Sequence, residues 1–196
     1  MDVGVLIPVK AFHRAKLRLV PALEPGARQL LVRHMAACVV AAAAPLPVTV
    51  VCDDDDVAAW AGAQGAAVVR APGRGLNRAV AHGVAALAAA GMSRVVVAHA
   101  DLPLARHLGS LVGGDGVTLV PDRHGGGTNV AVVPATAGFG FAYGPGSFPR
   151  HRAEAERLGL GVRVVRDLGL AWDVDQPADL QLPFVPVTAP APAPCS

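Results

Sequence analysis

Short valine-rich runs alternate with longer alanine-rich stretches along most of this chain. The early runs are apolar at every position, which is typical of parallel strands that helices cover on both faces. The alternation therefore predicts an α/β fold, a three-layer α/β/α sandwich around a mostly parallel sheet. We expect strands at residues 3–9, 48–52, 67–70, 94–99, 117–121, 129–134 and 162–166, and helices at residues 26–43, 56–63, 76–90, 104–111, 148–158 and 177–182.

Composition narrows the class of protein. Hydrophobic residues make up 53% of the 196-residue chain and charged residues 16%, which excludes a disordered chain. A net charge of +2, without a run of Lys or Arg, gives no basis for nucleic-acid binding. The mean hydropathy is +0.43, but the most apolar stretch, residues 35–51, contains two prolines and is too short to cross about 30 Å of hydrocarbon. We therefore expect no membrane association.

The length of the chain predicts a single domain over residues 1–184. Residues 185–196 alternate Pro and Ala, which predicts a flexible tail. A core-like strand begins at residue 3 with no signal segment before it, and the three cysteines fit neither a metal site nor a disulfide framework. These features favour a reducing, cytoplasmic location.

Three aspartates are expected to converge at strand ends. Asp101 follows the strand expected at residues 94–99, and Asp173 and Asp175 occupy alternate positions farther along the chain. In an extended backbone, residues two apart point the same way, so Asp173 and Asp175 can face one point. Mg²⁺ prefers carboxylate oxygens and often shares them with phosphates. The three acids therefore predict a Mg²⁺ site and phosphate chemistry at the sheet edge where α/β folds bind ligands.

Four cationic residues crowd the loop after the first expected strand: Lys10, Arg14, Lys16 and Arg18. A triphosphate needs such cations to neutralise charge in its transition state. The alternative interpretation is a solvated surface loop, which is the usual meaning of a charge run.

Two glycine-rich loops are candidate binding elements. Gly73 and Gly75 precede an expected helix, whose N-terminus would favour an anion or a nucleobase edge, although such turns are common without a ligand. Residues 125–127 are three glycines next to Thr128, which suggests a backbone nest for phosphate or carboxylate, with a flexible hairpin loop as the alternative. Ser147 could cap the following helix or hold a phosphate.

Other patterns in the sequence give no indication of a further binding or catalytic site. Residues 53–56 are four aspartates between an expected strand and an expected helix, where acids favour the helix dipole and cap the helix. The seven histidines show no zinc-ligand spacing, and the chain contains no Walker A pattern, which argues against a P-loop nucleotidase.

Several segments together resemble the guanylyltransferases of deazaflavin coenzyme F420 biosynthesis, the CofC/FbiD family. The matching segments are, in chain order, Pro8-Val9-Lys10, Ala15-Lys16-Leu17-Arg18-Leu19, Gly75-Leu76-Asn77, Ala100-Asp101-Leu102-Pro103, Pro121-Asp122-Arg123, Gly127-Thr128-Asn129, Gly144-Pro145-Gly146-Ser147-Phe148 with His151, and Asp173-Val174-Asp175 with Pro177 and Asp179-Leu180. The resemblance covers residues 3 to 182. At Leu17 the family usually has Ser or Thr, so a hydroxyl contact to phosphate is missing there.

The resemblance implies a nucleotide-diphospho-sugar-transferase-like (Rossmann-like) fold. It also implies transfer of GMP from GTP to the phosphate of a three-carbon phospho-acid, with release of pyrophosphate. That acid is phosphoenolpyruvate, 2-phospho-L-lactate or, in some members, 3-phosphoglycerate. A composition rich in Ala, Arg and Gly, as in high-GC actinobacteria, favours phosphoenolpyruvate. The partners would be these two substrates, with a homodimer left open.

The resemblance also implies a role for each matching residue. The implied catalytic residues are Lys10, Lys16, Arg18 and Asp101, and the implied Mg²⁺ ligands are Asp101, Asp173 and Asp175. The implied acceptor-binding residues are Thr128, Gly144 and Ser147, and the implied nucleotide-binding residues are Pro8, Lys10, Gly75 and Asn77. The attacking phosphate is already anionic, so no general base is needed and catalysis should rest on placement and charge neutralisation.

Two other functions remain in competition. Another nucleotidyltransferase of the same fold, such as a molybdopterin guanylyltransferase, would typically open with a Gly-x-Gly loop, where this chain has Pro8-Val9-Lys10. A non-catalytic GTP-binding protein would have no need of all three aspartates. GTP binding without pyrophosphate release would identify that second class.

Overall fold

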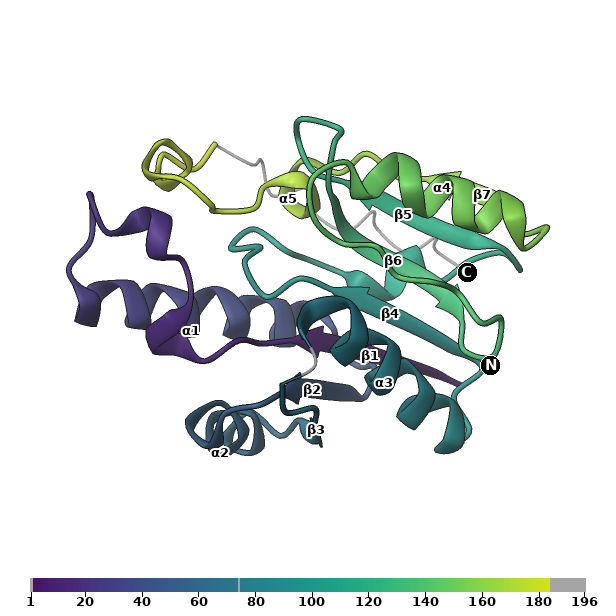
Figure 1. The fold of residues 1–196 in the computed structure, drawn as a ribbon, viewed down its shortest axis with the longest axis horizontal. Coiled ribbons are helices and arrows are strands. Elements are labelled where there is room, and N and C mark those ends of the chain that lie inside the picture. Colours follow the sequence, from purple (N-terminus) through teal and green to yellow (C-terminus); the bar gives the residue numbers. More distant parts are fainter. Residues whose placement is uncertain (1, 74, 184–196) are drawn as a thin grey trace, which may run out of the picture.

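The computed structural model describes residues 2–73 and 75–183, and it folds around one twisted sheet with helices on both faces (Figure 1). The tail predicted at residues 185–196 lies outside the described residues. Within the described part of the chain, no helix has both the length and the apolar character needed to cross a membrane.

The described strands form a single sheet in the order β3-β2-β1-β4-β6-β5-β7. Their bounds are β1 Val3–Pro8, β2 Val48–Cys52, β3 Ala67–Arg70, β4 Arg94–Ala98, β5 Val117–Pro121, β6 Thr128–Pro134 and β7 Val162–Val164. Each strand predicted from the sequence is present, which confirms the mostly parallel sheet. The exception to parallel pairing is β6, which runs antiparallel to both β4 and β5.

The reversed direction of β6 follows from its short connection to β5. A parallel pair needs a crossover of a dozen or more residues, whereas residues 122–127 form only a tight loop. As a result, the amino end of β6 lies at the same sheet edge as the carboxyl ends of β1, β4 and β5. This edge therefore gathers loops from both halves of the chain.

Four of the predicted helices are present, the short helix at residues 168–171 was not predicted, and the helix predicted at residues 177–182 is a 3-10 turn of four residues. Their bounds are α1 Pro25–Ala42, α2 Asp55–Ala63, α3 Gly75–Ala89, α4 Ser147–Arg157 and α5 Leu168–Ala171, with 3-10 turns η1 Phe12–Arg14, η2 Leu17–Leu19, η3 Leu108–Leu111 and η4 Pro177–Leu180. The helix predicted at residues 104–111 is wrong in its first half, because only η3 is helical and His107 before it is left-handed (φ 50°). The four-residue helix α5 is too short to show a helical period.

Alternating side chains of the strands build the two sides of the core. In β1, Val5 and Ile7 pack in the cluster that contains α1 and α2, while Leu6 packs against α3 on the other face. A separate cluster lies beneath α4 and is built on β5 and β6. The sheet thus lies between two helical layers, as the sequence predicts.

The acid run at residues 53–56 behaves as the sequence analysis predicts. The Asp54 carboxylate accepts a hydrogen bond from the backbone N–H of Val57 at 3.1 Å and so caps α2. Asp55 and Asp56 form surface ion pairs with Arg70 and Arg33. These acids therefore stabilise the helix start rather than bind a metal ion.

We expect Gly83→Ala to lower the free energy of unfolding by about 1–2 kcal/mol. A Cβ at this position in α3 would lie 2.7 Å from both Cδ atoms of Leu6, which is fully buried and cannot move aside. The matched control is Gly62→Ala in α2, where nothing lies within 4 Å and Ala should stabilise the helix by about 0.5–1 kcal/mol. Urea unfolding measures both, and equal effects of the two variants would contradict close packing of α3 on β1.

Candidate active site

A cleft runs along the sheet edge where β1, β2 and β4 end. One cavity of about 370 Å³ lies between the ends of β1 and β2 and the start of α3, and its walls include Pro8, Lys10 and Gly75. A neighbouring cavity shares Pro8 and Lys10 and extends to Asp101. A third cavity continues outward and is lined by charged residues that include Lys10, Arg14, Lys16, Arg18 and Asp175. The first cationic loop and two of the three predicted acids therefore line one cleft.

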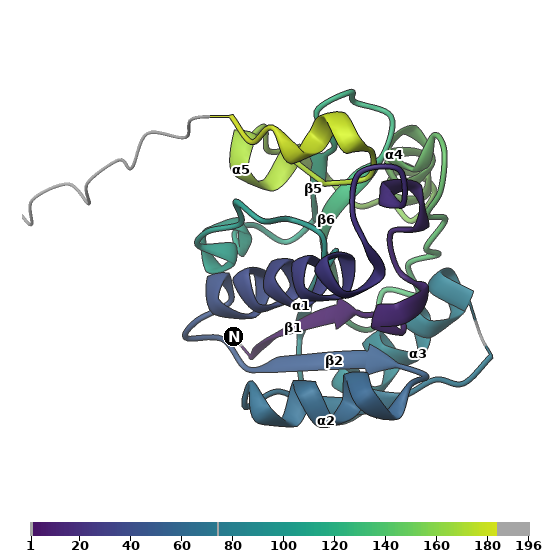
Figure 2. The same ribbon diagram turned by 90° about the vertical axis from the view of Figure 1, so that its left-hand side faces the viewer.

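Lys16 lies at the centre of the charged part of this cleft. Its ammonium is 2.5 Å from Oδ2 of Asp101 and 2.5 Å from Oδ1 of Asp175, although these residues are far apart in sequence. Figure 2 shows how the loop after β1 reaches the segment around η4. Burial disfavours the charged ammonium, but the two carboxylates outweigh burial and raise the pKa of Lys16. Lys16 therefore stays protonated and connects the loop after β1 with Asp101 and Asp175.

The backbone of Lys16 is itself strained. Its φ of 53° and ψ of 42° lie in the left-handed region, which costs a non-glycine residue roughly 1–2 kcal/mol. The two ion pairs of its side chain offset this cost. By contrast, Arg18 is 75% exposed and only reaches Asp175 at 3.6 Å, so its guanidinium is free to contact a ligand.

The three predicted acids have different environments. Burial would raise the pKa of Asp101, but the Lys16 ammonium, helped by His99, holds it below the usual value. The pKa of Asp173 is raised, first by burial and then by the negative charges of Asp101 and Asp175. The cleft thus carries more negative charge than Lys16 alone neutralises.

The donor chemistry of these acids fits a hard cation. Oδ1 of Asp101 is buried and has no hydrogen-bond partner among the described residues. Asp173 lies close enough to Asp101 and Asp175 for their negative charges to raise its pKa. Their present arrangement is that of an ion-pair network, however, because Lys16 lies between Asp101 and Asp175. Over residues 2–73 and 75–183, no three His, Cys, Asp or Glu side chains form a ready-made metal cage.

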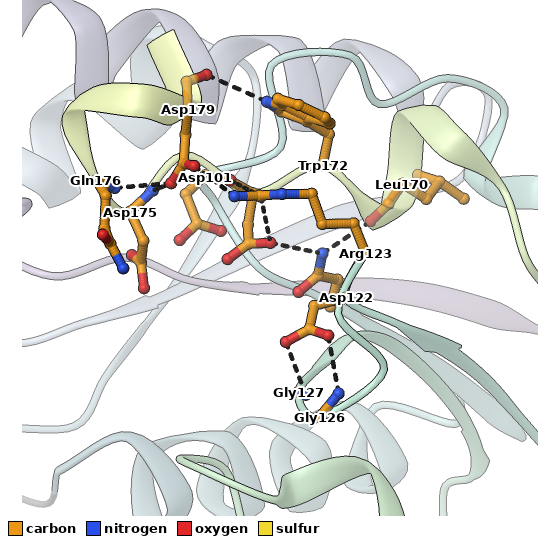
Figure 3. Close-up of polar contacts among 12 residues, drawn as sticks. Asp101, Asp122, Arg123, Gly126, Gly127, Leu170, Trp172, Asp175, Gln176 and Asp179 are labelled. Atoms are coloured by element: carbon orange, nitrogen blue, oxygen red, sulfur yellow. Dashed lines mark hydrogen bonds and ion pairs between the residues drawn. The ribbon is translucent and has the colours of Figure 1, made fainter. Parts of the chain in front are cut away.

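Arg123 holds the segment that carries two of the acids. Its guanidinium forms an ion pair with the buried Asp179, donates to the backbone oxygen of Asp173 at 2.9 Å and stacks on Trp172 (Figure 3). The Asp179 carboxylate in turn accepts the backbone N–H groups of Asp175 and Gln176 at 2.8 and 2.7 Å. The position of Asp173 and Asp175 therefore depends on an ion pair between the partly exposed Arg123 and the buried Asp179, which sequence spacing did not reveal.

The glycine loop between β5 and β6 does not offer its amides to a ligand. The backbone N–H groups of Gly126 and Gly127 donate to the Asp122 carboxylate at 3.0 and 2.7 Å (Figure 3). A Cβ at residue 127 would lie 2.6 Å from that carboxylate. The prediction of an open nest at these two amides is therefore wrong, because an internal acid from the same loop fills it.

The three predicted acceptor-binding residues form one group next to this loop. The backbone N–H of Thr128 donates to Oγ of Ser147 at 2.9 Å, and the N–H of Ser147 donates to the Gly144 oxygen at 3.0 Å. Thr128 and Ser147 are both buried, while Gly144 is exposed. The cap of α4 is Gly146 rather than Ser147, so the serine hydroxyl is not used for helix capping.

The loop before α4 is fixed by glycine conformations and by side chains around it. Gly144 and Gly146 adopt φ values of 116° and 73°, which other residues rarely adopt. Arg150 donates to the backbone oxygens of residues 142 and 145. Oδ1 of Asn77 accepts the N–H of Tyr143 at 2.7 Å, so this residue, predicted to bind nucleotide, contacts the loop of Gly144.

Asn129, to which the sequence pattern assigned no role, links the acceptor-binding residues with the segment that carries Asp173. The Asn129 amide donates to the Leu170 oxygen at 3.0 Å and lies 3.4 Å from Oδ1 of Asp173. It therefore connects the start of β6, next to Thr128, with the acidic segment. A polar side chain at the start of an otherwise apolar strand was the signal that could have identified it.

Comparison with known proteins finds a family and relatives that match most of this chain. The family described as "Guanylyl transferase CofC like" matches residues 3–185. A phosphoenolpyruvate guanylyltransferase of Sphaerobacter thermophilus is 36% identical over 190 residues, which cover 92% of each chain. Another of that name, from Thermomonospora curvata, is 40% identical over 199 residues, covering 95% of this chain and 85% of the relative.

Solved structures share the fold. A protein assigned as a nucleotide-diphospho-sugar transferase from Desulfovibrio desulfuricans superimposes with a TM-score of 0.74 at 20% identity, covering 92% of this chain and 85% of that one. A nucleotidyl transferase from a Methanothermobacter species superimposes with a TM-score of 0.69 at 17% identity, covering 91% and 94%. The fold predicted from the sequence is therefore confirmed.

We expect Arg123→Met to lower the free energy of unfolding by about 3 kcal/mol and to reduce turnover. The variant leaves the buried Asp179 carboxylate without its counter-ion and frees the backbone of Asp173. The control is Arg152→Met, whose exposed pair with Glu156 at 4.0 Å should contribute less than about 0.5 kcal/mol. Adding Asp179→Asn to Arg123→Met should recover part of the stability, and failure to do so would contradict the role of this ion pair.

Proposed function

The chain belongs to the CofC-like guanylyl transferase family, and we propose that it transfers GMP from GTP to the phosphate of phosphoenolpyruvate. Curated relatives of 36% and 40% identity carry that acceptor in their names, which supports the choice over 2-phospho-L-lactate and 3-phosphoglycerate. The product would enter the biosynthesis of coenzyme F420. The second product is pyrophosphate.

The strongest support is the charge distribution of the cleft. Lys10, Lys16 and Arg18 line its outer part, where they would meet the triphosphate of GTP. The cavity beside Pro8 and Gly75 has a volume of about 370 Å³, which is within the range of small-molecule sites and would take the nucleoside. Cations on one side and carboxylates on the other are the elements that phosphoryl transfer requires.

The reaction would proceed by direct displacement. A phosphate oxygen of the acceptor attacks the α-phosphorus of GTP, the bond from that phosphorus to the bridging oxygen breaks, and pyrophosphate leaves. The nucleophile is anionic at pH 7, so no side chain has to remove a proton from it. The contribution of the chain is to hold both anions in line and to neutralise their charge, with Lys10, Lys16 and Arg18 on the departing pyrophosphate.

We assign Asp101, Asp173 and Asp175 as the ligands of Mg²⁺. The unpartnered oxygen of Asp101 supports this assignment. The charges of Asp101 and Asp175 add to burial in raising the pKa of Asp173, which places the three carboxylates close to one another. A bound Mg²⁺ would offset the charge that develops on the phosphate oxygens. The Lys16 ammonium would then release the two acids that it pairs with and turn to the triphosphate.

The test of the function is pyrophosphate release with GTP and Mg²⁺, measured with each of the three acceptors in parallel. We expect release with phosphoenolpyruvate and little release with ATP in place of GTP. Product mass should equal GMP plus the acceptor minus water. GTP binding without release for any acceptor would contradict catalysis, and release with only another acceptor would correct the substrate.

We expect Asp101→Asn to lower kcat by about 100- to 1000-fold while the protein stays folded. The amide removes the charge that a cation requires but keeps the shape of the side chain. Asp115→Asn, at an exposed position, is the matched control and should leave kcat unchanged. Circular dichroism checks the fold of both variants, and near-normal kcat of Asp101→Asn at saturating Mg²⁺ would rule out the metal assignment.

A further inference from the structure

His151 is a fully buried side chain that contacts Thr128 at the start of β6 and Ala142 in the loop before α4. It comes from α4 and is 0% exposed. Its Nε2 lies 2.9 Å from the backbone nitrogen of Ala142, and its Nδ1 lies 3.0 Å from Oγ1 of Thr128. Both ring nitrogens therefore have a partner, and the partners differ in chemistry.

The partners fix where the single ring proton resides. A backbone N–H can only donate, so Nε2 of His151 must accept from Ala142 and carries no proton. Burial, with smaller contributions from the charges of Arg150 and His99, lowers the pKa of His151 to about 4, so the ring is neutral at pH 7. The proton must then be on Nδ1, which donates to Oγ1 of Thr128.

The same reasoning fixes the direction of two hydroxyl protons. Because Oγ1 of Thr128 accepts from His151, its own proton has to point to a different acceptor. Oγ of Ser147 accepts the backbone N–H of Thr128 at 2.9 Å, so its proton is directed away from that bond as well. Each hydroxyl is thus prepared to donate, and a pair of donors suits an anion such as a phosphate or carboxylate.

We propose that His151 is a positioning residue that sets Thr128 as a hydrogen-bond donor to the acceptor's phosphate or carboxylate. The inference rests on the proposed function and on the acceptor-binding role that the family resemblance implies for Thr128, Gly144 and Ser147. His151 itself does not touch the acceptor. It acts through Thr128 on one side and, through Ala142, on the loop that leads to Gly144 on the other.

A purely structural role for His151 is the competing explanation. The ring packs against Phe139 and Tyr143 at centroid distances of 5.7 and 4.9 Å, so any substitution will disturb packing. Packing alone does not require a particular tautomer of His151. A loss of packing would also affect the KM for the acceptor and the KM for GTP alike. The two explanations therefore differ in their effect on the acceptor and in the location of the proton.

Two variants separate the two polar contacts. Asn at position 151 places its amide near the position of Nδ1 and can still donate to Thr128. Gln places its amide near the position of Nε2 and can accept only the hydrogen bond from Ala142. We expect His151→Gln to raise the KM for phosphoenolpyruvate by about 10-fold or more, with the KM for GTP nearly unchanged. His151→Asn should remain within about 3-fold of the wild type for both substrates. Equal changes in both KM values, or no difference between Asn and Gln, would overturn the proposal.

A double-variant cycle tests whether His151 acts through Thr128. Thr128→Val removes the hydroxyl and should raise the KM for phosphoenolpyruvate by a factor similar to that of His151→Gln. The double variant should have a KM for phosphoenolpyruvate close to that of either single variant, because each change alone already removes the same interaction. Effects that multiply would show that His151 acts independently of Thr128.

Nitrogen-15 NMR of labelled histidine gives a readout that does not depend on turnover. The expected spectrum has Nδ1 of His151 protonated and Nε2 unprotonated between about pH 6 and 8. The opposite tautomer would overturn the inference even in a fully active enzyme. If the wild type releases no pyrophosphate, calorimetric affinity for phosphoenolpyruvate replaces KM in the same comparisons, and absence of binding would then refute both proposals.

Discussion

The ion pairs of Lys16 with Asp101 and Asp175 are the contacts on which the arrangement of the cleft depends. They join positions 85 and 159 residues apart and bring together the ends of β1 and β4 and the segment before η4. Burial disfavours the charges of Lys16 and Asp101, so each of these two groups requires an opposite charge close by. A ligand that enters this cleft must therefore exchange one ionic partner for another.

The fold could be predicted to a large extent because its signals are local. Valine-rich runs identify the strands within a few residues, and Asp54 caps α2 as the acid run indicates. The reversed direction of β6 was also readable, since the loop at residues 122–127 is too short for a parallel crossover.

The site could be predicted only in part, because its contacts join distant positions. The ends of strands placed Lys10 and Asp101 in the same cleft, as expected for an α/β sheet. That Lys16 lies between two acids depends on its left-handed backbone, and that Asp122 fills the glycine nest depends on the conformation of one loop. Residue types alone predict neither of these two contacts, and they do not predict the ion pair of Arg123 with Asp179 either.

The separate core beneath α4 has an evolutionary consequence. Thr128 belongs to β6 and Ser147 to α4, and Ala131 and Val133 on one face of β6 pack beneath α4. The lysine-bearing loop lies between β1 and α1, whose cluster covers the other face of β6. Mutations among the side chains beneath α4 can therefore accumulate with little repacking of the core around β1 and α1. A lineage could change which small phosphorylated acid it accepts while it inherits its nucleotide chemistry intact.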